Sequence, residues 1–197
     1  MDEEQRKQTV FSAAAELFMT QGVENTTIEH IANKADVATT FIAETYPSKE
    51  DMLVDVLAAS FNFDDSDVVN TITSHYATHT VAEKVYFYVE KRLEGLEQFP
   101  KGVLLEMFSI MFNLAQEKPS YLQQFVELDF FFVDDFISFL NVLKEKGEVS
   151  SDYPSNQAAE TLYSVLAFEF VLYLFEAEHS QQDLLSGINR KIQFLFP

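Results

Sequence analysis

Residue types that build disulfides, thiolate metal sites and tight turns are absent or rare in this sequence. It has no cysteine and no tryptophan, and glycine and proline number only five each among 197 residues. The absence of cysteine excludes disulfides and thiolate metal ligands, and it fits a reducing cytoplasm. The scarcity of glycine and proline favours long helices over a turn-rich all-β fold.

Basic residues are also scarce, because 13 Lys and Arg stand against 32 Asp and Glu, a formal charge of −19. Residues 1–50 alone hold four basic and nine acidic residues, a net charge of −5. A nucleic-acid-binding domain usually carries a basic patch that displaces counterions from phosphates. This segment lacks one, and the excess acid indicates a solvated surface that promotes solubility.

Long apolar runs are missing too. The longest nearly apolar stretch, Leu162–Phe175, is interrupted by Glu169 and falls short of the roughly 20 residues that span a bilayer. The first residues, MDEEQRKQ, are polar and do not form a signal peptide. We therefore expect a cytoplasmic globular protein without a membrane segment, with 47% hydrophobic and 14% aromatic residues available for its core.

The first fifty residues have the pattern of three short helices. An apolar stripe at helical spacing predicts a helix over residues 4–21, which Gly22 ends. Thr26 precedes Glu29 by three positions, a capping-box pattern for a second helix. Asp36 and Val37 form a turn into a third helix that ends before Pro47. Two short helices joined by a tight turn behind an amphipathic helix indicate a helix-turn-helix.

The rest of the chain predicts longer and more apolar helices. Ser48 opens a fourth helix, and the acidic cluster 64–67 begins another. Further helices are expected at 80–98, 100–114, 119–146, 158–179 and 182–196. The prediction is an all-α fold of about nine helices.

The head residues and their spacing resemble the TetR/AcrR family of transcriptional regulators. The resemblance rests on Ala14, Leu17, Phe18, Gly22, Thr26-Thr27, Ile31-Ala32, Ala35, Val37, Ile42, Ser48-Lys49-Glu50 and Leu53. It implies an N-terminal three-helix DNA-binding head at 1–50 and a larger helical ligand-binding and dimerisation domain at 51–197. It also implies a homodimer in which the two C-terminal helices of each chain pack as a four-helix bundle.

The candidate DNA contacts lie in and around the expected third helix. Where the family has a capping hydroxyl and a tyrosine, this chain has Ala38 and Ala43, and Glu44 adds a negative charge. The remaining candidates are Thr26, Thr27, Thr39, Thr40, Phe41, Thr45 and Lys49. Thr26, Thr27 and Lys49 are expected at phosphates, and Phe41 at a thymine methyl group.

The resemblance predicts a ligand-responsive regulator, a repressor as in most of this family, that binds double-stranded operator DNA. A lipophilic effector would release it by changing the separation of the two heads. The alternative is a dimer of the same fold with weak or lost operator binding, acting as a ligand- or protein-binding module. The head's net charge of −5 favours this alternative, whereas its intact apolar core favours the regulator.

Phenylalanine is concentrated in the second half of the chain, where a few acids interrupt it. Glu169, flanked by Phe168 and Phe170, is either a paired interface residue or a ligand-pocket acid. Because bases are almost absent from these apolar segments, we expect a neutral or cationic lipophilic effector. The candidate ligand-binding residues are Tyr86, Met107, Met111, Phe131, Asp135, Phe168 and Glu169. The candidate dimer-interface residues are Leu162, Leu166, Tyr173, Leu185, Ile188, Ile192 and Leu195.

Enzymatic signatures are missing. The sequence has no cysteine nucleophile, no phosphate-binding glycine loop and no G-x-S-x-G elbow. His75 and His79 share a helical face but lack the glutamate of a zinc-binding HExxH motif, so they are expected on a solvated face. We predict neither a metal, a cofactor nor an enzyme.

Overall fold

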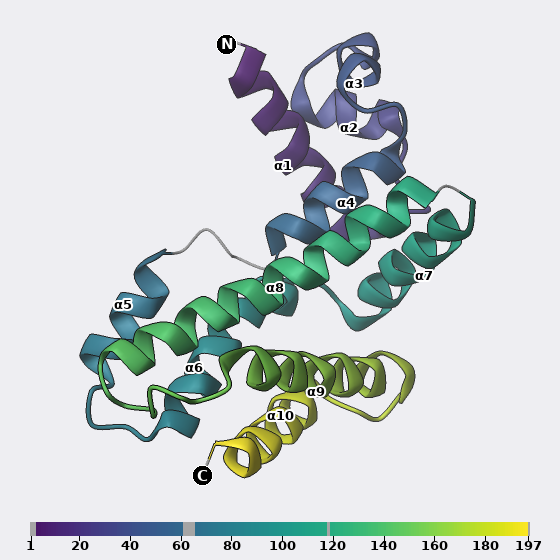
Figure 1. The fold of residues 1–197 in the computed structure, drawn as a ribbon. Helices are drawn as coiled ribbons and strands as arrows, with labels where there is room; N and C mark the ends of the chain where they lie inside the picture. Colours follow the sequence, from purple (N-terminus) through teal and green to yellow (C-terminus); the bar gives the residue numbers. More distant parts are fainter. Residues whose placement is uncertain (1–2, 61–65, 118, 197) are drawn as a thin grey trace. The chain divides into compact units, whose positions relative to one another are not determined.

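The computed structural model describes residues 3–60, 66–117 and 119–196 of the chain (Figure 1). These residues form ten α-helices and one 3-10 helix, which confirms the all-α prediction. The α-helices are α1 Glu3–Gln21, α2 Ile28–Ala35, α3 Thr39–Thr45, α4 Lys49–Ser60, α5 Ser66–His75, α6 Val81–Leu93, α7 Lys101–Glu117, α8 Pro119–Glu145, α9 Ser155–Phe175 and α10 Gln181–Leu195. The expected helix start at Asp64 and Asp65 lies outside the described residues.

The chain divides into two compact units. The first contains residues 1–60 and 98–125, and the second contains residues 61–97 and 126–197. Helix α7 therefore groups with the N-terminal helices, although it follows α6 of the second unit in sequence. The functional division between residues 1–50 and 51–197 stays a prediction.

The first unit is built around α1, which packs against α2 and α4, while α4 also contacts α7. The predicted stripe on α1 is largely correct, since Val10, Ala13, Ala14 and Phe18 are buried. Gly22 ends this helix at a φ of 84°, a left-handed conformation that glycine adopts without a Cβ penalty.

The cap of α2 differs by one residue from the sequence prediction. Thr27, not Thr26, is the N-cap: its hydroxyl accepts a hydrogen bond from the amide of His30, and the His30 side chain bonds the Thr27 amide in return. Histidine thus takes the place usually held by Glu or Gln in a capping box. Thr26 fits the sequence pattern equally well, but its side chain is buried.

The turn between α2 and α3 forms where the sequence predicts it. Asp36 is left-handed, with a φ of 53°, and its amide donates to the carbonyl of Ala32. Ala38 begins α3 without a side-chain cap. Ile42 is fully buried and anchors this short helix to the unit.

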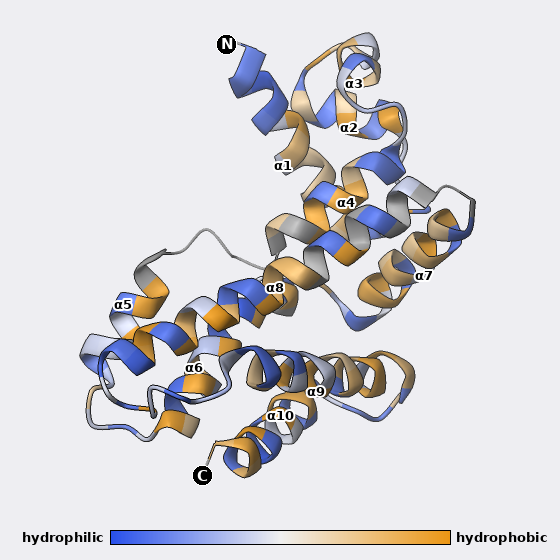
Figure 2. Ribbon diagram, viewed as in Figure 1, coloured by the Kyte–Doolittle hydropathy of each residue, from blue (hydrophilic) through white to orange (hydrophobic). Residues whose placement is uncertain are grey.

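The second unit has a core shared by α5, α6, α9, α10 and the C-terminal part of α8. Its aromatic members include Tyr88, Phe136 and Phe139, all fully buried, with Tyr88 stacked on Phe139 at a centroid distance of 4.4 Å. Figure 2 shows the hydrophobic residues of these helices, including those near the C-terminal end of α9. Four phenylalanines of this half are buried in the core, Phe132, Phe136, Phe139 and Phe196, whereas six are exposed: Phe112, Phe130, Phe131, Phe168, Phe175 and Phe194.

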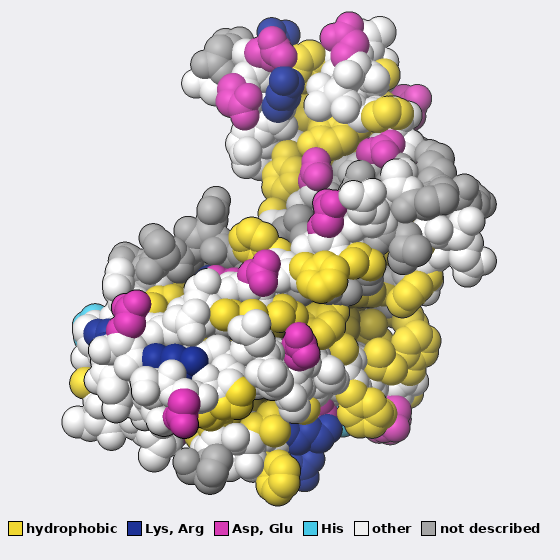
Figure 3. Space-filling model, in the orientation of Figure 1, with side chains coloured by type: hydrophobic (Ala, Val, Ile, Leu, Met, Phe, Trp, Pro, Cys, Tyr) yellow, Lys and Arg dark blue, Asp and Glu magenta, His cyan; other side chains and the backbone are white. Residues whose placement is uncertain are grey.

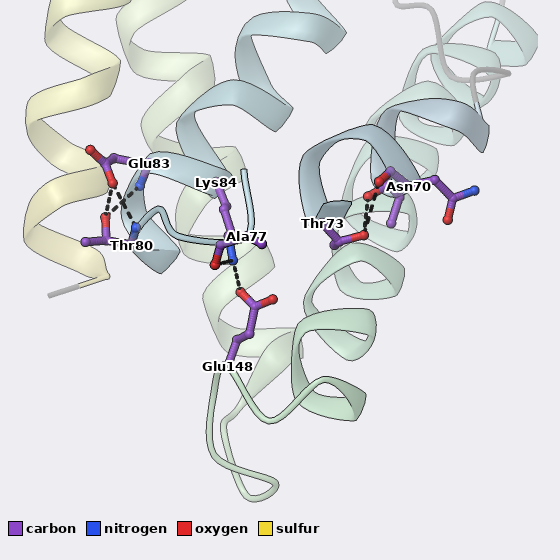
Figure 4. Close-up of polar contacts among 8 residues, drawn as sticks. Asn70, Thr73, Ala77, Thr80, Glu83, Lys84 and Glu148 are labelled. Carbon is purple, nitrogen blue, oxygen red and sulfur yellow. Dashed lines mark hydrogen bonds and ion pairs between the residues drawn. The ribbon is translucent and has the colours of Figure 1, made fainter. Parts of the chain in front are cut away.

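Helix α6 begins as predicted and ends earlier. Thr80 and Glu83 form the expected capping box (Figure 4), with the Thr80 amide donating to the Glu83 carboxylate over 2.8 Å. The helix stops at Leu93 instead of Gln98, and a short 3-10 helix, Leu96–Gln98, leads to Pro100.

Helix α9 starts at Ser155 rather than Ala158 and ends at Phe175 rather than His179. Its 21 residues are long and apolar enough to cross a membrane by length and composition alone. Core helices of soluble proteins meet the same criterion, and α9 packs extensively on α10. Leu162 and Leu166 of α9 lie in the core of the second unit.

Candidate functional site

The exposed side of α3 carries the residues predicted to read DNA. Thr39, Thr40 and Thr45 are exposed, together with Ala43 and Glu44. These short side chains present hydroxyl and methyl groups, which suit base edges and thymine methyls in a major groove. The helix thus has a candidate reading surface, but none of its residues is a Lys or Arg that would attract phosphates.

Phe41 is half-buried on α3 and lies beneath a cation that the sequence reasoning missed. The guanidinium carbon of Arg6, on α1, is 4.9 Å from the centroid of the Phe41 ring. This distance is within the range of a cation–π contact. No sequence pattern pointed to it, because the two residues lie on different helices.

Thr26 does not have the exposed position expected of a phosphate ligand. Its side chain is fully buried, its hydroxyl donates to the Gly22 carbonyl over 2.7 Å, and it accepts from the Gln21 side-chain amide over 3.2 Å. Thr27 is exposed at the start of α2. Of the two threonines, only Thr27 therefore presents its side chain to solvent.

Lys49, the other expected phosphate ligand, is turned into the protein. Its ammonium group donates to the carbonyl oxygens of Val23, Thr26 and Glu24 over 2.6, 2.9 and 3.2 Å. These three bonds match the three donors of a lysine ammonium. Lys49 therefore holds the segment between α1 and α2 rather than projecting into solvent.

The same segment is held from α7. A carboxylate oxygen of Glu106 accepts a hydrogen bond from the Glu24 amide over 2.5 Å. Tyr46 supports the unit elsewhere: its hydroxyl donates to Asp55 of α4 over 2.9 Å. Burial, together with this bond and the charge of Asp55, raises the pKa of Tyr46 to about 12.

Two further cations of the head are paired with acids. Lys7 bonds Glu3 over 2.9 Å and Lys34 bonds Glu16 over 2.7 Å. Basic and acidic side chains lie side by side on the visible face of the head in Figure 3. These ion pairs thus neutralise the positive charges of Lys7 and Lys34.

The predicted ligand-binding residues fall in both units. Met107 and Met111 of α7 are buried in the first unit. Tyr86, Asp135 and Glu169 belong to the second unit and make polar contacts there, while Phe131 and Phe168 are 53% and 55% exposed. Their role in ligand binding stays a prediction.

A buried polar group that sequence reasoning did not find joins α6 to α8. Arg92 is 1% exposed, and its guanidinium bonds both carboxylate oxygens of Asp135 over 2.8 and 3.2 Å. The Tyr88 hydroxyl donates to the same carboxylate. Burial, with the charge of Asp135, raises the pKa of Tyr88 well above its ordinary value. Asp135, predicted as a ligand residue, is thus already bonded to two side chains.

A second buried base, Lys84, pairs with Glu148 and also donates to the carbonyl of Ala77 (Figure 4). Lys84 is 1% exposed. The expectation that bases are absent from the apolar segments is therefore wrong for α6, whose pattern VAEKVYFYVEKRL places Lys84 and Arg92 on its buried side.

Glu169 is buried in the contact between α9 and α10 and forms an ion pair with Lys191. The Lys191 ammonium also lies 4.8 Å from the centroid of the Phe168 ring. Gly187 of α10 faces the Glu169 carboxylate so closely that a Cβ there would collide with it. Glu169 is therefore a paired carboxylate within its own chain.

Four of the predicted dimer residues, Leu162, Leu166, Ile188 and Ile192, are buried in the core of their own chain. They leave almost no surface for a partner. The large apolar side chains that α9 and α10 expose are instead Phe168, Val171, Phe175 and Phe194. Helical periodicity identified an apolar stripe on each helix without distinguishing the core side from the outer side.

The histidine pair shows no metal-site geometry. His79 lies against the rings of Tyr76 and Phe87, at centroid distances of 5.1 and 5.7 Å. Across the described residues, no group of three or more His, Asp or Glu side chains is placed to hold a metal ion.

The head matches a known family. Residues 10–56 fit the model of the bacterial regulatory proteins of the tetR family. No curated protein matches the chain. The matched range begins in α1 and ends in α4, and it therefore covers the whole helix-turn-helix.

Solved structures share the fold over nearly the full chain. A putative TetR-family regulator from Mesorhizobium loti has a TM-score of 0.73 at 16% identity, covering 99% of this chain and 96% of its own. FadR of Thermus thermophilus, in complex with lauroyl-CoA, has a TM-score of 0.66 at 22% identity and coverages of 96% and 92%. FadR of Bacillus subtilis, in complex with stearoyl-CoA, has a TM-score of 0.63 at 17% identity and coverages of 96% and 97%. Residues 10–56 therefore match the model of the tetR family of bacterial regulatory proteins, and the chain shares its fold with these solved structures.

Proposed function

We propose that the chain is a ligand-responsive transcriptional repressor that binds operator DNA as a cytoplasmic homodimer and is released by a lipophilic small molecule. The observation that carries this proposal is the head. Its buried positions form a complete helix-turn-helix, and α3 exposes Thr39, Thr40 and Thr45 on one short helix. Regulators of this family are not enzymes, in agreement with the missing catalytic motifs.

DNA recognition would rest on α3 and the start of α2. Thr39, Thr40 and Thr45 would contact base edges, and Thr27 a phosphate at the start of α2. Lys49 and Thr26 would contribute indirectly, because they hold the segment that leads into α2. A two-fold dimer would double these weak contacts over two half-sites.

The exposed apolar side of α9 and α10 supports the homodimer. Phe175 and Phe194 are 69% and 84% exposed, and Phe168 and Val171 lie on the same helix as Phe175. Hydrophobic side chains gather near the C-terminal end of α9 in Figure 3. Exposed phenylalanines of this number are unfavourable in water and are typical of an interface.

The effector is proposed to be lipophilic and neutral or cationic. The two buried bases, Arg92 and Lys84, are each paired with a carboxylate. Neither pair leaves a net positive charge for an anionic group. A second candidate is a fatty acyl-CoA, because two similar structures are FadR proteins in complex with lauroyl-CoA and stearoyl-CoA.

Release would follow from linkage. An effector shifts the protein only by its difference in affinity for two conformations. If the effector favours the conformation whose heads do not fit successive major grooves, DNA affinity falls by the same factor by which DNA weakens effector binding.

A gel-shift and footprinting experiment on the DNA upstream of the protein's own gene tests the proposal. We expect a specific shift at low salt that weakens at moderate salt and is reversed by the effector. A folded dimer that gives no specific shift at either salt would refute operator binding. That result would support the rival function, a ligand- or protein-binding module, which the exposed Glu44 on α3 favours.

A thermal-shift screen tests the effector class. Lipophilic cations, neutral lipophiles and lauroyl-CoA are compared on the wild type and on Glu169→Gln. Stabilisation by lauroyl-CoA alone would reject the neutral or cationic class. Equal stabilisation of the wild type and Glu169→Gln by a cation would remove Glu169 from the ligand site.

A further inference from the structure

The positive charge of the head is almost entirely engaged within the protein. Lys7 and Lys34 are bonded to Glu3 and Glu16. Lys49 donates to three backbone carbonyls. Arg6 is the remaining base of residues 1–50. Its guanidinium lies over the Phe41 ring, and its charge acts on Glu3.

The Arg6 side chain is exposed, and Phe41 is half-buried. The ring thus forms a platform on α3, and the guanidinium carbon lies over it at 4.9 Å from the centroid. A guanidinium that meets a ring through its face keeps the N–H donors in its plane available for another partner. A planar fork of this kind matches the two oxygens of a phosphate.

The position of this fork is set by α3. Phe41 follows Thr39 and Thr40 directly, and both are exposed on the candidate reading side. A cation held over Phe41 therefore lies beside the helix that is proposed to enter the major groove. Glu3 of α1, whose carboxylate also feels the charge of Arg6, is bonded by Lys7 at 2.9 Å.

We propose that Arg6, held by stacking on Phe41, is the residue that binds a DNA phosphate beside α3. The inference rests on the proposed DNA binding. It gives Phe41 a second role, as the platform of a phosphate ligand. It also explains how an acidic head retains one oriented positive contact for each half-site.

The test is fluorescence anisotropy on a labelled duplex from the region upstream of the gene and on a random duplex of the same length, between 50 and 200 mM salt. Arg6→Gln is compared with Arg6→Lys, Phe41→Leu and the control Lys7→Gln, which removes a neighbouring charge already paired with Glu3. Circular dichroism verifies that each variant is folded. Arg6 is exposed, so its replacement does not disturb the core.

We expect Arg6→Gln to weaken binding to both duplexes and to lower the salt dependence by about one phosphate contact per head. For two heads, the wild type then loses roughly tenfold more affinity than Arg6→Gln over this salt range. Arg6→Lys keeps the salt dependence but binds more weakly, because the lysine lacks the planar fork. Phe41→Leu also weakens binding, because the fork loses its platform.

Equal affinities and salt slopes for Arg6→Gln and Lys7→Gln would overturn the inference while leaving DNA binding intact. Unchanged affinity in Phe41→Leu with a loss in Arg6→Gln would overturn the role of stacking. A wild type that binds neither duplex at 50 mM salt would refute the proposed function, and the inference with it.

Discussion

Glu106 of α7 occupies the space that a side chain at Gly22 would need. A Cβ built on Gly22 would lie 2.5 Å from a carboxylate oxygen of Glu106. The same carboxylate accepts the amide hydrogen of Glu24 over 2.5 Å. The missing side chain at residue 22 therefore permits α7 to hold the segment between α1 and α2.

Gly22→Ala is expected to destabilise the protein by more than the left-handed backbone alone requires. Gly147 is the control, since its φ is 71° and a Cβ there would meet nothing within 4 Å. Gly147→Ala should cost about 1 kcal/mol, and Gly22→Ala should cost more, because Glu106 must move. Urea denaturation of both variants measures the difference.

The double variant Gly22→Ala/Glu106→Ala separates the two contributions. If the steric account is correct, its loss of unfolding free energy is smaller than the sum of the two single losses. Equal costs for Gly22→Ala and Gly147→Ala would contradict the close contact.

Arg92 and Asp135 should show the energetics of a buried pair. Arg92→Met leaves the Asp135 carboxylate with a single side-chain donor, Tyr88, and is expected to cost about 3 kcal/mol. Lys91→Met, which breaks the exposed pair with Glu94, is the neighbouring control and should cost less than about 1 kcal/mol. Similar losses in the two variants would mean that the buried pair contributes no more than the exposed one.

The apolar periodicity of the head was sufficient to predict its fold. Phe18, Ile31 and Ile42 each belong to the apolar positions of a different head helix, and all three are fully buried, because a small helical domain has few ways to cover such positions. The turn at Asp36 was equally visible, since aspartate tolerates a left-handed backbone. The capping threonine was misplaced by one residue because Thr26 and Thr27 both satisfy the local pattern.

Polar partners were much less predictable. Lys49 bonds a carbonyl 26 residues away and Arg92 a carboxylate 43 residues away, and no local pattern specifies either partner. The side of α9 was ambiguous for another reason. The helix is apolar nearly all round, so Leu162 in the core and Phe175 at the surface look alike in sequence.

Tyr46 contributes stability to the head that is lost at alkaline pH. Burial and the hydrogen bond to Asp55 raise its pKa from 10.0 to about 12. The folded state thus binds the phenolic proton more tightly than the unfolded state. This contribution is fully present below pH 10 and is lost as the pH rises towards 12.

Urea denaturation of the wild type and of Tyr46→Phe over pH 8 to 12 measures this contribution, with the pH range set by the pKa values. The difference in unfolding free energy should be constant below pH 10 and should fall, to the disadvantage of the wild type, above it. Parallel curves throughout would mean that burial and the bond to Asp55 do not raise the pKa of Tyr46.

Phe175 tests the proposed homodimer and its interface on the exposed side of α9. Its side chain is 69% exposed, whereas Leu162 on the same helix is fully buried. Phe175→Ser should raise the dimer dissociation constant by at least about tenfold, because each dimer loses two aromatic contacts at its apolar interface. Size-exclusion chromatography with light scattering over a dilution series measures the change, and the unfolding temperature of the monomer should hardly move. Phe130→Ser on α8 is the matched control, with a side chain that is 64% exposed. If Phe130→Ser dissociates the dimer and Phe175→Ser does not, the interface lies on α8 rather than on α9 and α10.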